Sequence, residues 1–196
     1  GSYPVVFDER VSSSLIGHLT AAINGASISR GSSWLRDSLN KRILPKNFML
    51  SEDPHRPRIS GSRPFDSEGL PTVKKNFIED GVLKNLILDL RSARKLNLKP
   101  LGNAYRSLSS PPQPNPGNLE LSSGTDSVSD IIRGIKNGLL VTSLIGSTIN
   151  PNTGDYSRGA NGFWIQDGEI VYPVNECTIA GNLKEMLLSL TASNDG

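Results

Sequence analysis

The sequence predicts an α+β fold, built mainly from antiparallel β-sheet with a few flanking helices. Three observations support this prediction. Short β-like runs fill much of the chain from residue 72 onward, two pairs of these runs meet at an Asp-Gly dipeptide, and only a few segments have helical periodicity. We expect a single domain over residues 3–196, cut from a longer chain, with Gly1 and Ser2 as a remnant of expression.

The N-terminal part should contain one strand and one long helix. Residues 3–8 are β-like, and an apolar helical face follows at Val11, Leu15, Leu19, Ala22 and Ile23. Asp8 is expected to cap this helix and Gly25 to end it in the left-handed conformation. A second short helix is expected around residues 33–39. Five prolines between residues 44 and 71 then predict extended backbone with turns.

The remaining elements follow from turn signals and periodicity. Two strands should flank residues 79–81, and two more should flank residues 166–168. Strand-like runs at 119–124 and 138–146, a helical turn at 92–98 and a Pro/Ser loop at 107–118 are also expected. Short apolar faces predict helices at 127–136, capped by Ser127 or Ser129, and at 178–190.

Composition narrows the functional classes. The net charge of +2 is too small and too scattered to predict a nucleic-acid groove. The densest basic run, residues 91–95, is more typical of a solvated strand or helix end than of a phosphate site. The single cysteine excludes an internal disulfide and fits a reducing compartment, and no apolar run approaches membrane-spanning length. We therefore expect a cytoplasmic protein without direct membrane or nucleic-acid contacts.

Residues able to carry hydrolytic chemistry are few and scattered. His18 lacks a second histidine one turn away, and His55 lies beside Glu52 and Asp53, where an exposed loop is the simpler interpretation. Cys177 follows an acidic residue and is more typical of a small side chain packed at a strand end than of a nucleophile. No GxSxG or GxxxxGK[ST] pattern is present.

Two carboxylates also occur close together. Asp66 and Glu68 are two residues apart in "FDSEG", so on a strand they would share a face, and paired acids can divide acid and base roles. The favoured interpretation is a turn in which Asp66 accepts hydrogen bonds from nearby amides and Gly69 adopts a positive φ.

Several longer motifs carry a family resemblance. They are "FDSEG" at 65–69, "DGVLKNLILDLRSARKLNL" at 80–98, "PNPGNL" at 114–119 and "TGDYSRGANGFWIQDGEIVYPVNECTIAGNL" at 153–183. Together with the first 35 residues, they make nearly the whole chain resemble the C-terminal domain of the TldD/PmbA family, and its PmbA (TldE) branch more than its TldD branch.

The resemblance implies a function for the chain. In this family a TldD-type zinc metalloprotease and a PmbA/TldE-type subunit act together on unfolded or extended peptides, including a microcin precursor and an antitoxin, and the family is linked to modulation of DNA gyrase. The zinc-binding HExxxH of the TldD branch falls here on Ile16, Gly17 and Ala21. The resemblance therefore implies no catalytic or metal-binding residue in this chain, with zinc expected in a TldD-type partner.

We interpret the hairpin predicted around residues 166–168 as structural framework, with one strand edge that can bind a peptide or a partner. Phe163 and Ile165 should point to one face and Trp164 to the other, with Tyr172 within reach of cross-strand aromatic contacts. An Asp155–Arg158 pair is expected to fix the start of the strand or to face a partner. The candidate residues for contact with a peptide or a partner are Asp155, Arg158, Trp164 and Tyr172. A strand edge here could bind an extended peptide by β-augmentation.

Two functional classes remain open from the sequence. The preferred one is a non-catalytic subunit that binds a TldD-type protease chain, or a second copy of itself, and a peptide. The alternative is a stand-alone metal-dependent or cysteine hydrolase built from His18, His55, Cys177, Asp66 and Glu68. A third idea, direct binding to DNA, has little support from the charge.

Overall fold

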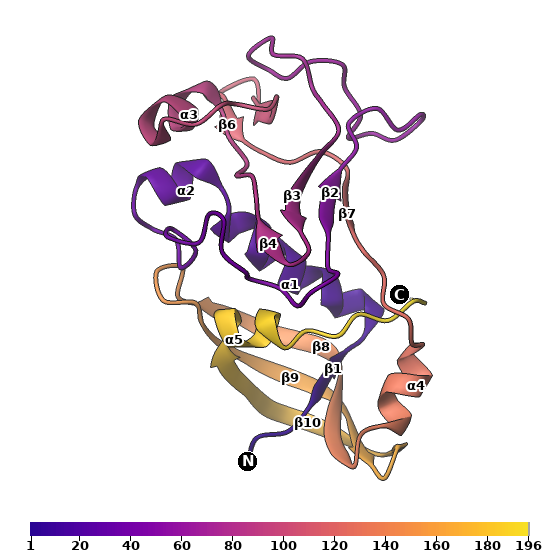
Figure 1. The fold of residues 1–196 in the computed structure, drawn as a ribbon. Helices are drawn as coiled ribbons and strands as arrows, with labels where there is room; N and C mark the ends of the chain where they lie inside the picture. The colour runs from indigo at the N-terminus through magenta and orange to yellow at the C-terminus, as the bar shows by residue number, and fades with distance from the viewer. Residues whose placement is uncertain (196) are drawn as a thin grey trace.

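The computed structural model describes residues 1–195, apart from the side chains of residues 147 and 148. The described residues contain two four-stranded sheets, one two-stranded ribbon and five short to medium helices, and most strand pairs are antiparallel (Figure 1). The predicted α+β class is therefore confirmed. No helix in this part of the chain is both long enough and apolar enough to cross a membrane.

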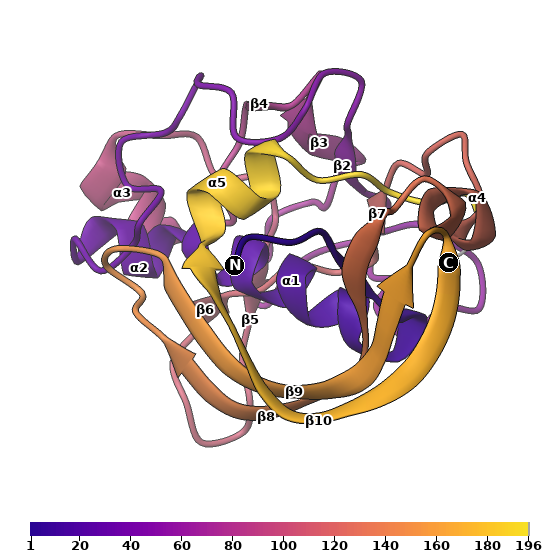
Figure 2. The ribbon, with the colours of Figure 1, turned by 90° about the horizontal axis from the view of Figure 1, so that it is seen from below.

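The larger sheet has the order β1-β8-β9-β10, with β1 parallel to β8 and the other pairs antiparallel. Its strands are β1 (Val5–Phe7), β8 (Asn137–Ile149), β9 (Asp155–Gln166) and β10 (Glu169–Asn182). The three long strands bend into a trough, with α1 (Glu9–Ala22) on its inner side and α5 (Leu183–Leu188) following β10 (Figure 2).

The smaller sheet has the order β4-β3-β2-β7 and is fully antiparallel. Its strands are β2 (Leu50–Glu52), β3 (Lys75–Glu79), β4 (Val82–Leu83) and β7 (Leu119–Leu121). A two-stranded ribbon of β5 (Ala104–Tyr105) and β6 (Gln113–Pro114) lies beside α2 (Gly25–Ser29) and α3 (Leu90–Leu96). The remaining helix is α4 (Val128–Arg133).

The apolar side chains form one main core and one small cluster on opposite faces of the larger sheet. Leu139, Val141 and Trp164 contribute to the main core, which extends through α1 to the smaller sheet. Leu140 and Ile165, the alternate residues, pack under α4. The expected opposite orientation of Trp164 and Ile165 is therefore confirmed, because successive side chains of a strand point to opposite faces.

Local signals predicted several element ends correctly. The Asp8 carboxylate accepts a hydrogen bond from the Arg10 amide at 3.0 Å and caps α1. Ser127 caps α4 in a reciprocal capping box with Asp130. Asp80-Gly81 and Asp167-Gly168 both have positive φ angles and close the two hairpins, as the dipeptides predicted.

Three predictions about helices were wrong. Gly25 does not end α1: Ile23 is the C-cap and Gly25 is the first residue of α2, because only a residue without Cβ fits beside Leu88 there. Residues 33–39 form turns rather than a helix. The Leu35 amide donates to the Ser33 hydroxyl at 3.0 Å, and this local bond competes with helix formation.

The third error concerns residues 178–190. This segment does not form one helix, because β10 continues to Asn182 and only Leu183–Leu188 is helical. Apolar residues at Ile179 and Leu183 suit a helical face, yet both are buried here on different elements. Pairing of β10 with β9 as far as Asn182 opposite Asp155 overrides the local periodicity.

Candidate functional site

The helix α1 presents no metal-binding side chain at the three positions that the resemblance assigns to zinc ligands and catalytic acid. Ile16 packs partly against the main core, while Gly17 and Ala21 are exposed. A Cβ added at Gly17 would meet no atom within 4 Å, so the surface beside it is open. These side chains offer no nitrogen, oxygen or sulfur donor, so they do not fit a zinc ion.

His18 lies between these positions and belongs to a partly buried polar cluster with Tyr156 and Arg158. Its ring meets the Tyr156 ring edge-on, with centroids 6.2 Å apart. His18 Nε2, Tyr156 Oη and Arg158 Nε are buried and have no hydrogen-bond partner among the described residues. Sequence reasoning missed this cluster because Tyr156 and Arg158 are far from His18 in the chain, and no periodic signal connects them.

The electrostatics of this cluster favour uncharged groups. Burial, with a smaller contribution from the positive charge of Arg158, lowers the pKa of His18 below its usual value. Burial also raises the pKa of Tyr156, although Arg158 opposes that shift. His18 is therefore neutral at neutral pH and its imidazole can accept a proton, but no other histidine, cysteine or carboxylate joins it in a metal-binding group within the described residues.

Cys177 is half-buried on β10 and acts as a thiol donor. Its Sγ lies 3.2 Å from the Ala160 carbonyl oxygen on β9, so its proton is directed to the backbone. The same side chain lines a hollow of about 450 Å³ on the inner side of the larger sheet, together with Tyr3 and Trp164. This hollow contains no histidine that could serve as a base for the thiol.

Asp66 and Glu68 serve the backbone, as the turn interpretation predicted. The buried Asp66 carboxylate accepts from the amides of Glu68, Leu70 and Ala104 at 2.9–3.0 Å, and Gly69 has a φ of +80°. Glu68 accepts from the Leu90 amide at 2.7 Å and so stabilises the start of α3. Both carboxylates are therefore already hydrogen-bonded.

His55 is exposed and does not form a ligand cluster with the neighbouring acids. Its Nε2 lies 3.1 Å from Thr72 Oγ1, and its amide donates to Asp53. The carboxylate of Glu52 is buried instead against Lys75, at 2.5 Å, and accepts from Asn103. The residues of the alternative hydrolase are thus distributed over α1, β10 and the loops of the smaller sheet, and each has a local structural role or an isolated position.

Asp155 and Arg158 form no ion pair in the part of the chain that the structure describes, so the predicted pairing is wrong. Asp155 accepts from the Thr153 hydroxyl at 2.6 Å and from the Asn182 amide at 3.1 Å, and these bonds lower the pKa of its carboxyl group. Residues three apart on a strand point to opposite faces, so Arg158 is directed toward α1 instead. Asp155 therefore stabilises the end of the hairpin, where β10 gives way to α5.

Trp164 and Tyr172 are opposite each other in the β9–β10 register, as the hairpin prediction allowed. The ring that Trp164 contacts is Tyr3, edge-on at 5.2 Å, rather than Tyr172. Tyr172 is about half exposed and adjoins Ile170 and Val171, which are exposed to a similar extent. An exposed apolar stretch therefore lies on the last strand of the sheet.

β10 is the edge strand of the larger sheet. Its neighbour on one side is β9, and no other strand pairs with it among residues 1–195. Register shifts occur between Ile170 and Tyr172 and between Val174 and Cys177, where Glu176 has a φ of +54°. Beyond the second shift the register runs without interruption from Cys177 to Asn182, so this segment is the longest regularly paired part of the edge strand.

Comparison with known proteins places the chain in a family. A family model described as "PmbA/TldA metallopeptidase C-terminal domain" matches residues 1–196. The chain is 44% identical over 193 residues to metalloprotease PmbA of Escherichia coli O157:H7, and 42% identical over 192 residues to a PmbA homologue of Haemophilus influenzae. Each alignment covers 98% of this chain and 41% of the relative.

Solved structures agree with the sequence relatives. A candidate modulator of DNA gyrase from Bacteroides thetaiotaomicron VPI-5482 superimposes with a TM-score of 0.88 at 31% identity, covering 100% of this chain and 42% of that one. TldE from Thermococcus kodakarensis gives a TM-score of 0.83 at 28% identity, covering 97% and 44%. The chain therefore spans about two fifths of the length of these relatives, and it belongs to the PmbA/TldD family as a C-terminal domain of the PmbA type.

Proposed function

We propose that the chain is the C-terminal domain of a non-catalytic PmbA/TldE-type subunit, which acts together with a TldD-type zinc metalloprotease on extended peptides. The proposal rests on one observation: the residues at positions 16, 17 and 21 of α1 have no metal-binding group. Aliphatic carbon and a bare glycine stand where a zinc-dependent partner would hold its ligands and its general acid–base group. The zinc of the complex accordingly belongs to the partner.

The edge of β10 supports a role in peptide binding. An extended peptide can add to an exposed strand edge through main-chain hydrogen bonds, with side-chain pockets giving selectivity. The uninterrupted segment from Cys177 to Asn182 offers such an edge, and the hollow lined by Tyr3, Trp164 and Cys177 lies next to it on the inner side of the sheet. Gyrase modulation is the description of structural neighbours, and the modest net charge gives no support for direct DNA binding.

The subunit assignment is tested by purifying the protein that contains this chain from its own cells. We expect a TldD-type chain to co-purify, zinc to be present at about one ion per heteromeric pair, and the zinc to remain with the TldD-type chain after separation. The same preparation from cells lacking the TldD-type chain should contain no stoichiometric zinc. Stoichiometric zinc in the separated PmbA-type chain would refute the assignment.

The peptide-binding edge is tested by proline substitution. Successive backbone amides of a strand point to alternate sides, so Thr178→Pro and Ile179→Pro remove amides directed toward opposite sides of β10. We expect the substitution that removes the outward amide to weaken peptide binding while leaving the circular dichroism spectrum unchanged. Leu108, which is fully exposed in the Pro/Ser loop, provides a control position for Leu108→Pro. An unchanged peptide affinity in a folded edge variant would remove the β10 edge from the proposal but leave the subunit assignment standing.

A further inference from the structure

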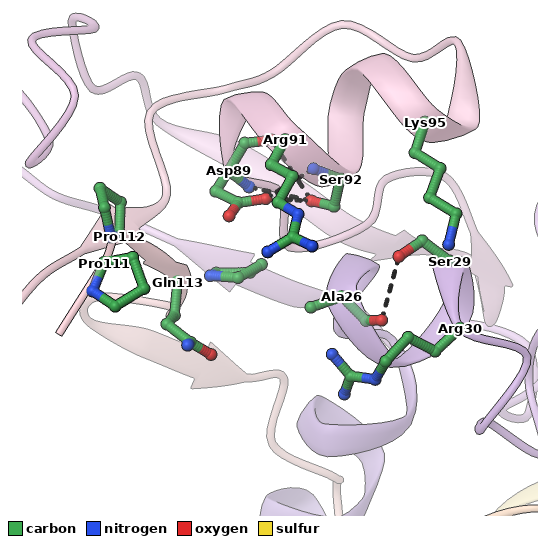
Figure 3. Close-up of a pocket in the computed structure, with 11 residues that line it drawn as sticks. Ala26, Ser29, Arg30, Asp89, Arg91, Ser92, Lys95, Pro111, Pro112 and Gln113 are labelled. Carbon is green, nitrogen blue, oxygen red and sulfur yellow. Dashed lines mark hydrogen bonds between the residues drawn. The ribbon is translucent and has the colours of Figure 1, made fainter.

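A small cavity of about 110 Å³ lies between α2, α3 and the proline-rich segment 111–114. Three cationic side chains line it, and they come from both helices: Arg30 from the end of α2, and Arg91 and Lys95 from α3 (Figure 3). In Figure 3, Arg91 and Lys95 extend from α3 toward α2, with Lys95 directed to Ser29 and Arg30 crossing below them. We call this cavity the α2–α3 pocket.

Two basic residues of the run 91–95 line the pocket and one does not. Arg91 and Lys95 are four residues apart, so they share one face of α3, and that face lines the pocket. Arg94 is exposed but does not line it. From the sequence, the whole run was expected to be a solvated strand or helix end, because nothing in the order of the chain indicates that α2 lies opposite α3.

The three cations are not neutralised by the protein. Among the described residues, none of them has a carboxylate within 4.0 Å. The acidic residue that lines the pocket, Asp89, is buried and accepts from the amide and hydroxyl of Ser92 as the N-cap of α3. Arg91 is also in the first turn of α3, where the helix dipole disfavours a positive charge, so helix stability does not explain it.

The walls of the pocket are held in place by the fold. The Asn24 side chain donates to the Pro114 carbonyl at 3.0 Å, and the Gly25 amide donates to the Ile87 carbonyl at 2.8 Å. A Cβ on Gly25 would lie 2.4 Å from Leu88 Cδ2 and 2.9 Å from Ser92 Oγ, so the start of α2 packs tightly against the residues at the start of α3. A ligand would therefore enter a site whose backbone is already arranged, which lowers the entropic cost of binding.

The geometry points to a binding site for a phosphate group. The volume is well below the roughly 300 Å³ at which pockets for drug-sized ligands begin, and it suits one small oxyanion. The planar fork of a guanidinium matches two oxygens of a phosphate, and a lysine adds a compact point charge. Three cations also suit a phosphate better than a monovalent carboxylate, because a phosphoester carries about −1.5 to −2 charges at neutral pH.

The ligand is either inorganic phosphate or the phosphate of a small phosphomonoester. Both present the same oxyanion, and the exposed position of all three cations leaves room for a substituent outside the pocket. The pocket lies beside α2 and α3, at the far end of the molecule from the middle of β10 in Figure 1. Its occupancy can therefore be tested without reference to peptide binding or to the protease partner.

The test is an NMR titration of the ¹⁵N-labelled chain, in which the amide chemical shifts are measured as inorganic phosphate or, separately, glycerol 3-phosphate is added. Each titration is matched with sodium chloride at about 0.1 M ionic strength, where the Debye length is about 10 Å. We expect saturable shifts of the amides of Ser29, Arg30, Arg91 and Lys95. Tighter binding of glycerol 3-phosphate would identify the ligand as a phosphoester, and equal or weaker binding would identify it as inorganic phosphate.

Matched variants separate a built site from general attraction of anions. Arg91→Ala combined with Lys95→Ala should weaken phosphate binding at least about tenfold, since two charge-assisted contacts are lost. Arg94→Ala changes a charge on the same helix outside the pocket and should leave the affinity within about twofold. Absence of saturable shifts at these amides, or equal weakening by Arg94→Ala, would overturn the inference. Unchanged amide positions in the rest of the spectrum show that each variant is folded.

Discussion

At the scale of single residues, two helical glycines have opposite physical roles. Gly17 lies in the middle of α1, where no atom comes within 4 Å of an added Cβ. Gly25 begins α2, where an added Cβ would overlap Leu88 and Ser92. The sequence alone does not distinguish these two glycines. Only the packing shows that a side chain can be added at Gly17 and not at Gly25.

Gly17→Ala should stabilise the chain. Glycine in a helix interior costs about 0.5–1 kcal/mol relative to alanine because the unfolded chain has more conformational freedom. The open surface at Gly17 means that the new methyl group creates no clash. Urea denaturation should show a free energy of unfolding that is higher by about this amount, and a decrease would show that residue 17 makes a close contact in solution.

Gly25→Ala should destabilise the chain by about 1–3 kcal/mol, as expected for overpacking of a well-packed contact. The Cβ would lie 2.4 Å from Cδ2 of the buried Leu88 and 3.0 Å from the Ile87 carbonyl oxygen, so the residues packed around the start of α2 must shift. The same urea measurement provides the check, with Gly17→Ala as the control for a glycine-to-alanine change in a helix. Equal stabilisation by both substitutions would contradict the close contact of the two helices.

His18→Gln should reduce the dependence of stability on pH. Burial lowers the pKa of His18 in the folded chain. As the pH falls below the unfolded value of about 6.5, the unfolded state therefore takes up a proton first, and folding loses stability. Stability from this group is complete above that pH and decreases below it. The unsubstituted chain should lose more stability than His18→Gln between about pH 7.5 and pH 5.5, and parallel curves would contradict this.

At the scale of elements, the junction between β10 and α5 depends on one side chain. The side-chain oxygen Oδ1 of Asn182 accepts from the Lys184 amide at 3.0 Å and caps α5, while its side-chain nitrogen Nδ2 donates to the Thr153 carbonyl and the Asp155 carboxylate. This residue therefore ends the strand, begins the helix and holds the β8–β9 turn against both. The sequence predicted a helix through this point because it could not show that β9 pairs with residues 177–182.

Asn182→Ala should destabilise the chain by about 0.5–2 kcal/mol, the usual cost of losing an N-cap. Asn152, an exposed residue of the neighbouring turn, gives a matched control, because its side chain makes no hydrogen bond among the described residues. Asn152→Ala should change the stability by less than about 0.5 kcal/mol in the same urea titration. Equal effects of the two substitutions would show that the cap contributes little.

The elements also show which parts of the fold a sequence can predict. Asp8 and Ser127 gave helix starts, and Asp80-Gly81 and Asp167-Gly168 gave hairpins, because these signals act within a few residues. The full length of β10 and the position of α2 depend on contacts between distant segments. For the same reason the turn role of Asp66 was predictable, whereas the cluster of His18, Tyr156 and Arg158 was not.

At the scale of the whole molecule, the two sheets have different roles. The smaller sheet is held by a buried ion pair of Lys75 and Glu52, with Asn103 and the Gly117 amide completing the hydrogen bonds to the carboxylate. The larger sheet wraps α1 and leaves its last strand open (Figure 2). We infer that the first arrangement supports the fold, while the second presents the surfaces available to a partner or a peptide.

We propose that α1 cannot hold a catalytic metal and that the PmbA-type chain depends on a TldD-type partner for cleavage. This proposal is tested most directly by mixing an unfolded peptide with the natural protein that contains this chain, purified without any TldD-type subunit. We predict no cleavage beyond the rate in buffer, and cleavage after the TldD-type subunit is added. Cleavage by the purified PmbA-type protein alone, at a rate that the added subunit does not increase, would contradict the account.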